Sequence, residues 1–215
     1  MDSLLNDYIS LVGGKNKDIN KGVNKHLNKN RKKNSYKNKR ENFIRPRYLE
    51  SYEDYKNNVL PEGLTRNRQW VYDIFDGKKE KERILYQNSD FLLIPDIKWD
   101  GKDKWELRIV AFFKDKELHS MRDLTGEHIE LLEQVKNTSC KIIKEKFELN
   151  EDQLKIFFHY RPTVWQLHLH FHCLFLKHTS SSIERAHSIY SVLENLKLDT
   201  DYFKKVKIHC FNDIE

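Results

Sequence analysis

The feature that most constrains this chain is the run His159-Tyr-Arg-Pro-Thr-Val-Trp-Gln-Leu-His-Leu-His-Phe-His172. After Trp165, polar and apolar residues alternate, which is typical of a β-strand whose successive side chains point to opposite faces. The apolar face would pack on a core and would consist of Leu167, Leu169, Phe171 and Cys173. The opposite face would carry Gln166, His168, His170 and His172.

Several imidazoles on one face of a strand favour a chemical role. They could bind zinc, because His-x-His on a strand supplies two ligands on the same side. Alternatively, one imidazole could attack phosphorus while its neighbour donates to the phosphate oxygens or the leaving group, since histidine has both protonation states available near neutral pH. The third interpretation, histidines that merely cover a sheet edge, fits one histidine better than three alternating ones.

Length and composition indicate one sizeable core with an appendage. The chain has 215 residues, of which 38% are hydrophobic and 33% are charged. No apolar run approaches the roughly 18 residues of a membrane span, and the N-terminus lacks the basic start of a signal peptide. The three cysteines form no CxxC pair, so we expect reduced thiols in the cytoplasm or nucleus and no cysteine-rich zinc site. These cysteines are Cys140, Cys173 and Cys210.

The net charge of +6 comes from the N-terminal tail. Residues 1–40 hold 11 Lys and Arg against 3 Asp, so the rest of the chain is slightly acidic. The Lys- and Asn-rich residues 1–44 cannot bury enough apolar surface to offset the entropy lost on ordering, and we expect them to be disordered. Such a tail could contact RNA non-specifically or act as a nuclear address. The alternative is compositional drift in a Lys- and Asn-rich proteome.

The remaining sequence predicts a mixture of strands and helices. We expect strands at residues 91–94, 106–113, 154–159, 167–176 and 206–211. We expect amphipathic helices at residues 125–147, with Thr125 as the N-cap, and at residues 183–196. The order shows no regular βαβ rhythm, and the 7 glycines form no phosphate-binding loop. The predicted class is therefore α+β, built around an antiparallel sheet.

The histidine run resembles the signature of the histidine-triad superfamily, and specifically of the scavenger mRNA-decapping enzymes. Their pattern is His-Tyr-x-Pro, three residues, and then alternating histidines. Other segments are similar to the family in the same order: Gln69-Trp-Val-Tyr-Asp-Ile-Phe-Asp76, Phe91-Leu-Leu-Ile-Pro-Asp-Ile-Lys-Trp99, Met121-Arg-Asp-Leu-Thr-Gly-Glu-His-Ile-Glu-Leu-Leu132 and Ile183-Glu-Arg-Ala-His187. The similarity covers about residues 46–211. It implies a histidine-triad-like antiparallel sheet with two main helices.

The resemblance also implies an activity. Family members cleave the triphosphate bridge of 7-methylguanosine-capped nucleotides and release 7-methylguanosine monophosphate. The reaction passes through a covalent phosphohistidine and uses neither a metal nor another cofactor. We therefore expect a metal-independent cap hydrolase.

The distance from His-Tyr-x-Pro sets the register of the triad. Counted from His159, the family's central histidine, the nucleophile, falls on His168, and its neighbour on the same face is His170. Gln166 then stands where the family has its first histidine. Glutamine keeps a hydrogen-bond donor but cannot act as an acid, so the resemblance predicts that Gln166→His would raise turnover. A register shifted by two residues would complete the triad with His172 but break the upstream spacing.

A cap-binding site is implied as well. Trp70 would stack on the cationic methylated guanine with a cation–π contribution, Ile97 would close the other side of the base, and Glu80 would accept two hydrogen bonds from the Watson–Crick edge. Other positions match contacts to the ribose and the phosphates: Asp96, Lys98, His159, Thr163 and Arg185. Without the resemblance, Glu80 would pass for part of a solvated charged run.

One part of the family pattern is nearly missing. Family members carry a largely β N-terminal domain that is swapped between subunits and closes over the site, and here only residues 45–61 resemble its end. We expect a tail at 1–44, a remnant of the lid domain and hinge at 45–66, and the catalytic domain at 67–215. Without a lid, we expect an open site that accepts longer capped RNAs. On resemblance alone, we expect a homodimer.

Other functions stay open. The glutamine and the missing lid would also suit a cap-binding protein that has lost catalysis. A hydrolase of unmethylated dinucleoside polyphosphates, or a metal-dependent hydrolase, would use the same histidine strand.

Overall fold

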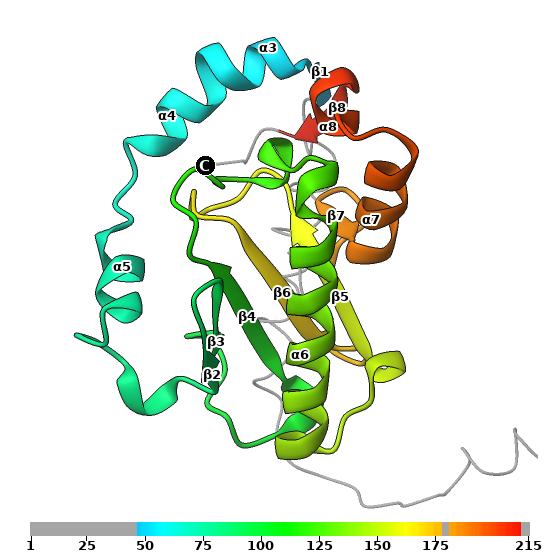
Figure 1. Cartoon of the computed structure of the whole chain (residues 1–215). Helices are drawn as coiled ribbons and strands as arrows, with labels where there is room; N and C mark the ends of the chain where they lie inside the picture. The colour runs from blue at the N-terminus through cyan, green and yellow to red at the C-terminus, as the bar shows by residue number, and fades with distance from the viewer. Residues whose placement is uncertain (1–46, 178–180, 212–215) are drawn as a thin grey trace, which may run out of the picture. The chain divides into compact units, whose positions relative to one another are not determined.

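The computed structural model describes residues 47–177 and 181–211, and the predicted tail at 1–44 lies outside them. Six strands form one sheet in the order β2-β3-β4-β6-β5-β7, with antiparallel neighbours throughout (Figure 1). They are β2 (Tyr86–Gln87), β3 (Phe91–Pro95), β4 (Arg108–Phe113), β5 (Leu154–His159), β6 (His168–Cys173) and β7 (Ala186–Ser188). A second ribbon pairs β1 (Arg47–Glu50) with β8 (Ile208–Phe211). The expected α+β class with an antiparallel sheet is confirmed.

One face of the sheet packs on the main hydrophobic core. Leu169, Phe171 and Cys173 of β6 are fully buried on this side, as the alternation predicts. The helices α6 (Ile129–Phe147) and α7 (Ile189–Leu198) contribute their apolar residues to the same core. Helix α6 lies along this face in Figure 1. The central strand is thus anchored by the burial of its apolar side.

The other face carries the histidines beside a second, smaller apolar cluster. In the β4–β6 register, Phe112 pairs with His168 and Val110 with His170, so these side chains share a face. Helix α5 (Gln69–Phe75) packs Val71 on this cluster. Because α5 covers this side of the sheet, His168 and His170 are buried rather than solvated.

The helix expected at 183–196 is wrong at its start. Residues Ala186–Ser188 form β7, which pairs with β5, and α7 begins only at Ile189. Without this segment, the outer backbone N–H and C=O groups of β5 would lack hydrogen-bond partners. The pairing of β7 with β5 therefore overrides the helical periodicity of the sequence. Ile183, which would have belonged to the apolar face of the helix, is 92% exposed.

The strand predicted at 154–159 is confirmed with the same bounds as β5, and the other predicted elements are present with shifted ends. Strand β4 begins at Arg108 because Lys104–Glu106 form a 3-10 turn, and β6 ends at Cys173 because Leu174 and Phe175 turn into solvent. Helix α6 follows a 3-10 turn at Gly126–His128, so Thr125 precedes that turn rather than the helix itself. Strand β8 begins at Ile208, two residues after the expected start.

The segment after β1 packs on the main core. It comprises α3 (Tyr52–Asp54), a π-helical turn (Tyr55–Val59) and α4 (Leu60–Leu64). Tyr55 is fully buried and stacks on Trp165, with ring centroids 6.3 Å apart. The predicted division at residue 66 stays a prediction. The remaining short elements are 3-10 turns at Lys81–Arg83, Met121–Asp123 and Glu151–Gln153, and α8 (Tyr202–Lys205).

A buried ionic cluster joins β1 to the loop that follows β5. The Glu50 carboxylate is fully buried and accepts from Arg161 Nε at 2.8 Å and from the Tyr160 hydroxyl. Arg122, also fully buried, has its Nε 3.4 Å from Glu50 Oε1 and donates to the carbonyls of Phe203 and Val206 at 2.8 Å. Such a cluster is stable only with every partner present, because removing one leaves a buried charge uncompensated.

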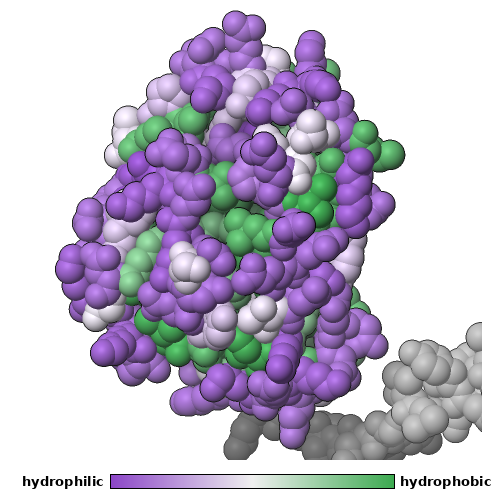
Figure 2. Space-filling model, in the orientation of Figure 1, coloured by the Kyte–Doolittle hydropathy of each residue, from purple (hydrophilic) through white to green (hydrophobic). Residues whose placement is uncertain are grey.

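The surface is mostly polar on the face that Figure 2 shows, with hydrophobic residues visible between the polar ones. Among the described residues, no helix has the length and apolar character that crossing a membrane requires.

The contact between α4 and Trp165 gives a test of the fold. A methyl group added at Gly63 would overlap the Trp165 ring. Overpacking typically costs about 1–3 kcal/mol, whereas replacing a helical glycine by alanine gains at most about 1 kcal/mol. We therefore expect Gly63→Ala to lower the free energy of unfolding in urea. Adding Trp165→Phe should recover part of the loss, whereas a stabilised Gly63→Ala variant would contradict the contact.

Candidate functional site

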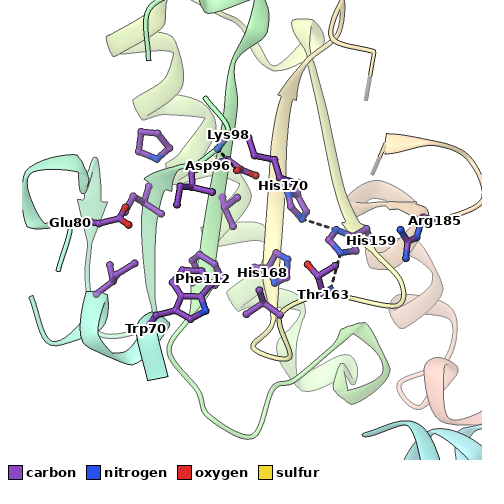
Figure 3. A pocket seen from close by; sticks show the side chains of 16 residues that line it. Trp70, Glu80, Asp96, Lys98, Phe112, His159, Thr163, His168, His170 and Arg185 are labelled. Atoms are coloured by element: carbon purple, nitrogen blue, oxygen red, sulfur yellow. Dashed lines mark hydrogen bonds between the residues drawn. The ribbon is translucent and has the colours of Figure 1, made fainter. Parts of the chain in front are cut away.

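A cavity of about 340 Å³ lies on the histidine face of the sheet, next to α5. Ten of the eleven site residues predicted from the sequence line it (Figure 3): Trp70, Glu80, Asp96, Ile97, Lys98, His159, Thr163, His168, His170 and Arg185. They come from segments far apart in the chain, which the sheet and α5 bring together. Gln166 is the predicted residue that does not line the cavity.

The main chain fixes the ring of His168. Its Nδ1 lies 2.7 Å from the carbonyl oxygen of Gln166. A carbonyl oxygen only accepts, so Nδ1 carries the hydrogen and Nε2 keeps its lone pair. His168 is 7% exposed and lines the cavity. The ring therefore has the tautomer that a nucleophile acting through Nε2 requires.

A second hydrogen-bonded chain orients His159 and His170. The backbone N–H of Thr163 donates to His159 Nε2 over 3.4 Å, so the hydrogen of His159 is on Nδ1. That Nδ1 lies 2.9 Å from His170 Nε2, which accepts. Figure 3 shows both bonds. His159, at the end of β5, and His170, on β6, are thus a linked pair beside His168.

Burial favours the neutral forms of His159 and His168. Desolvation lowers the pKa of His168. The pKa of His159 lies well below its usual range, first because of burial and then because of the positive charges that His168 and Arg185 would carry beside it. At neutral pH, His168 therefore has an unprotonated nitrogen available for attack.

The opposite end of the cavity is aromatic and acidic. The Trp70 ring is half-exposed and meets Phe112 edge to face, with centroids 5.9 Å apart. Glu80 has a left-handed backbone (φ 51°), and its carboxylate accepts from Arg83 Nη1 at 2.5 Å. The other nitrogen of that guanidinium, Nη2, donates to the carbonyls of Pro95 and Asp96 at 3.1 and 3.2 Å. Arg83 thus ties Glu80 to the segment that carries Asp96.

Charges of opposite sign lie at opposite ends of the cavity. Lys98 and Arg185 are its cations, and Glu80 and Asp96 are its carboxylates. In Figure 3, Arg185 lies at the histidine end and Glu80 at the far end beyond Trp70. The arrangement can bind a ligand that is anionic at one end and offers hydrogen-bond donors or a cation at the other.

Sequence reasoning missed the apolar walls and Arg83. The walls are Ile74, Ile94, Pro95, Val110, Phe112 and Val164. Period-two alternation in residues 108–113 could have placed Val110 and Phe112 on the histidine face, had that strand been taken as buried on both sides. Arg83 follows Glu80 by three residues, a spacing that could have indicated the pair.

His172 lies further along the strand and does not line the cavity. It is 1% exposed and meets His170 edge to face, with centroids 5.5 Å apart. The three histidine rings that line the cavity together are His159, His168 and His170, whose ligand-capable nitrogens lie within 4.8 Å of one another. These three could hold a metal ion if the hydrogen between His159 and His170 were displaced.

The buried histidines predict a pH dependence of stability. Burial lowers the pKa of His159, His168 and His187 in the folded state, whereas unfolded histidines titrate near pH 6.5. Below that pH the unfolded state binds more protons, so the free energy of unfolding should fall as pH drops from about 8 to about 5.5. Denaturant titrations at both pH values measure this, and His168→Gln should reduce the drop. The same change at the exposed His209 is the control; an equal effect there would contradict the assignment.

Comparisons with known proteins agree with these observations. The family described as "Scavenger mRNA decapping enzyme C-term binding" matches residues 69–187. The chain is 36% identical to the m7GpppX diphosphatase of Homo sapiens over 162 residues, which is 73% of this chain and 48% of the relative. It is 33% identical to that of Caenorhabditis elegans over 171 residues, or 78% of this chain and 55% of the relative. The chain therefore spans about half the length of the curated relatives it matches.

Among solved structures, Hnt3 in complex with DNA and guanosine has a TM-score of 0.45 and 20% identity, covering 62% of this chain and 79% of that one. The family match includes α5, the strands that line the cavity and the loop between β5 and β6, and it covers more than half of the chain. This chain belongs to the scavenger mRNA decapping enzyme family.

Proposed function

We propose that this chain hydrolyses the triphosphate bridge of 7-methylguanosine caps and releases 7-methylguanosine monophosphate. One observation carries the proposal: a single cavity has a buried imidazole with a fixed tautomer at one end, and an aromatic ring with a carboxylate at the other. Membership of the family and the relatives named m7GpppX diphosphatase support it.

The reaction would begin at His168. Its Nε2 attacks the phosphorus bonded to 7-methylguanosine, an N–P bond forms, and the anhydride P–O bond to the remaining nucleoside diphosphate breaks. The phosphorylated ring is cationic, and the Gln166 carbonyl, 2.7 Å from Nδ1, stabilises that charge. Water then attacks the phosphorus, which releases 7-methylguanosine monophosphate and restores the free imidazole.

The other residues of the cavity would bind the substrate. Lys98 and Arg185 offer charge to the phosphates, and the Thr163 hydroxyl and His170 offer hydrogen bonds. A methylated guanine is cationic, so Trp70 would gain a cation–π contribution by stacking on it. Glu80 would accept from the Watson–Crick edge, and Ile97, which is 79% exposed, would close on the other side of the base.

Partners and compartment are part of the proposal. We propose capped RNA fragments or cap dinucleotide as substrates, non-specific RNA contact by the basic residues 1–44, and a homodimer. The cytoplasm, the nucleus or both would hold such an enzyme, because capped fragments arise where mRNA is degraded. Size-exclusion chromatography with light scattering tests the dimer.

The central test measures hydrolysis of a 7-methylguanosine-capped dinucleotide with excess chelator. The parent chain should release 7-methylguanosine monophosphate, and His168→Ala should lose at least about 10³-fold in kcat, because the nucleophile is gone. His209→Ala, at an exposed site, should be unaffected. Activity that disappears with the chelator would favour a metal-dependent hydrolase at the three histidines. Tight cap binding without product would mean a cap-binding protein.

The base-reading end gives a second test. Glu80→Gln keeps the size of the side chain but loses the charge that accepts hydrogen bonds, so KM for the methylated cap should rise about tenfold, as expected for a hydrogen bond to a charged group. Arg83→Met, which releases Glu80 from its partner, should shift KM in the same direction. Glu82→Gln, the same change at the exposed neighbour, is the control. Equal KM values for the Glu80→Gln and Glu82→Gln variants would remove Glu80 from base recognition.

A further inference from the structure

Gln166 is fully buried, and its side-chain amide is fully engaged. Nε2 donates to the carbonyl oxygens of Phe113, at 2.8 Å, and of Asp115, at 2.7 Å. Oε1 accepts from the Tyr72 hydroxyl at 3.2 Å. Both donor hydrogens of the amide are used by the main chain, so in this arrangement neither reaches a phosphate in the cavity.

The main chain of the same residue holds the nucleophile. Its carbonyl oxygen accepts from His168 Nδ1 at 2.7 Å. The side chain of Gln166 therefore fixes the residue whose backbone sets the tautomer and direction of the His168 ring.

A second hydrogen bond, besides the one to Tyr72, attaches the α5 segment to this loop. Arg68, directly before α5, donates from Nη1 to the Trp165 carbonyl at 2.9 Å. Arg68 and Tyr72 are four residues apart, so they lie on the same side of the helix. Helix α5 also carries Trp70 and Ile74, which line the cavity. Residues 165 and 166 thus hold the base-binding helix at two points one turn apart.

A histidine cannot make the contacts of this glutamine. A neutral imidazole has one N–H and one lone pair, so it cannot donate to two carbonyls and also accept from Tyr72. A protonated imidazole could donate twice, but it would not accept, and it would place a charge at a fully buried position. The three contacts around Gln166 fit an amide.

We propose that Gln166 is a positioning residue that couples the base-binding helix α5 to the nucleophile His168, and not an acid–base residue impaired by substitution. The inference deepens the proposed cap hydrolysis and depends on it for its kinetic test. It reverses the expectation drawn from the family pattern: Gln166→His should lower turnover instead of raising it.

The test compares the full chain with Gln166→His, Gln166→Glu and Tyr72→Phe on the capped dinucleotide. Both Gln166 variants lose at least one donor to the main chain, so kcat should fall about 10- to 100-fold, as expected for a misplaced reactive group. Gln166→His should add no new ionisation to the pH profile of kcat. Tyr72→Phe removes only the bond to α5, so KM should rise severalfold while kcat changes little. Gln134→His and Gln134→Glu, the same changes at an exposed position of α6, should match the parent.

The outcomes separate this proposal from the proposed function. A higher kcat in Gln166→His would overturn the positioning role of Gln166. The same holds if the Gln166 and Tyr72 variants have a lower melting temperature but unchanged kcat and KM. If the Gln166 variants do not fold, Tyr72→Phe decides through its KM. If the parent shows no hydrolysis, the proposed function fails, and the coupling is then measured as cap affinity by tryptophan fluorescence. Weaker binding by Tyr72→Phe would support the coupling, and equal binding would refute it.

Discussion

The structure depends on a central strand that is buried on both faces for different reasons. Strand β6 lies between β4 and β5 and pairs with both of them. Its apolar side stabilises the fold against α6 and α7, and this burial offsets the desolvation of the histidines on the other side. The same burial lowers the pKa of His168 and favours its neutral form. One face of β6 therefore stabilises the fold, and the opposite face supplies the histidines that line the cavity.

The alternation in the histidine run was enough to predict the strand and its two faces, and the order of the predicted elements indicated the antiparallel class. The family pattern placed ten side chains that the structure brings to one cavity, including Glu80, which no local pattern distinguishes from its charged neighbours. Their individual roles in catalysis and binding stay predictions. The family resemblance could supply the set of residues, because its motifs are defined along the chain.

Features that depend on pairing between distant segments were not predictable in the same way. The periodicity of residues 183–196 indicated a helix throughout, yet the edge of the sheet takes residues 186–188 as a strand. The surroundings of Gln166 come from the end of β4 and from α5, more than 50 residues away in sequence. The family pattern shows that Gln166 stands in place of a histidine. Only the structure shows that its amide donates to the carbonyl oxygens of Phe113 and Asp115.

The Glu50 cluster has a consequence for how this protein can be recombined with other sequences. Arg122, Arg161 and Tyr160, which lie further along the chain, share one carboxylate from β1, and β1 itself is the partner strand of β8. A fusion that replaces the chain before a point between residues 50 and 67 would remove Glu50 and leave the charges of Arg122 and Arg161 without their carboxylate partner. Fusion points that preserve the loop after β5 must therefore lie upstream of residue 47, whatever sequence is joined there.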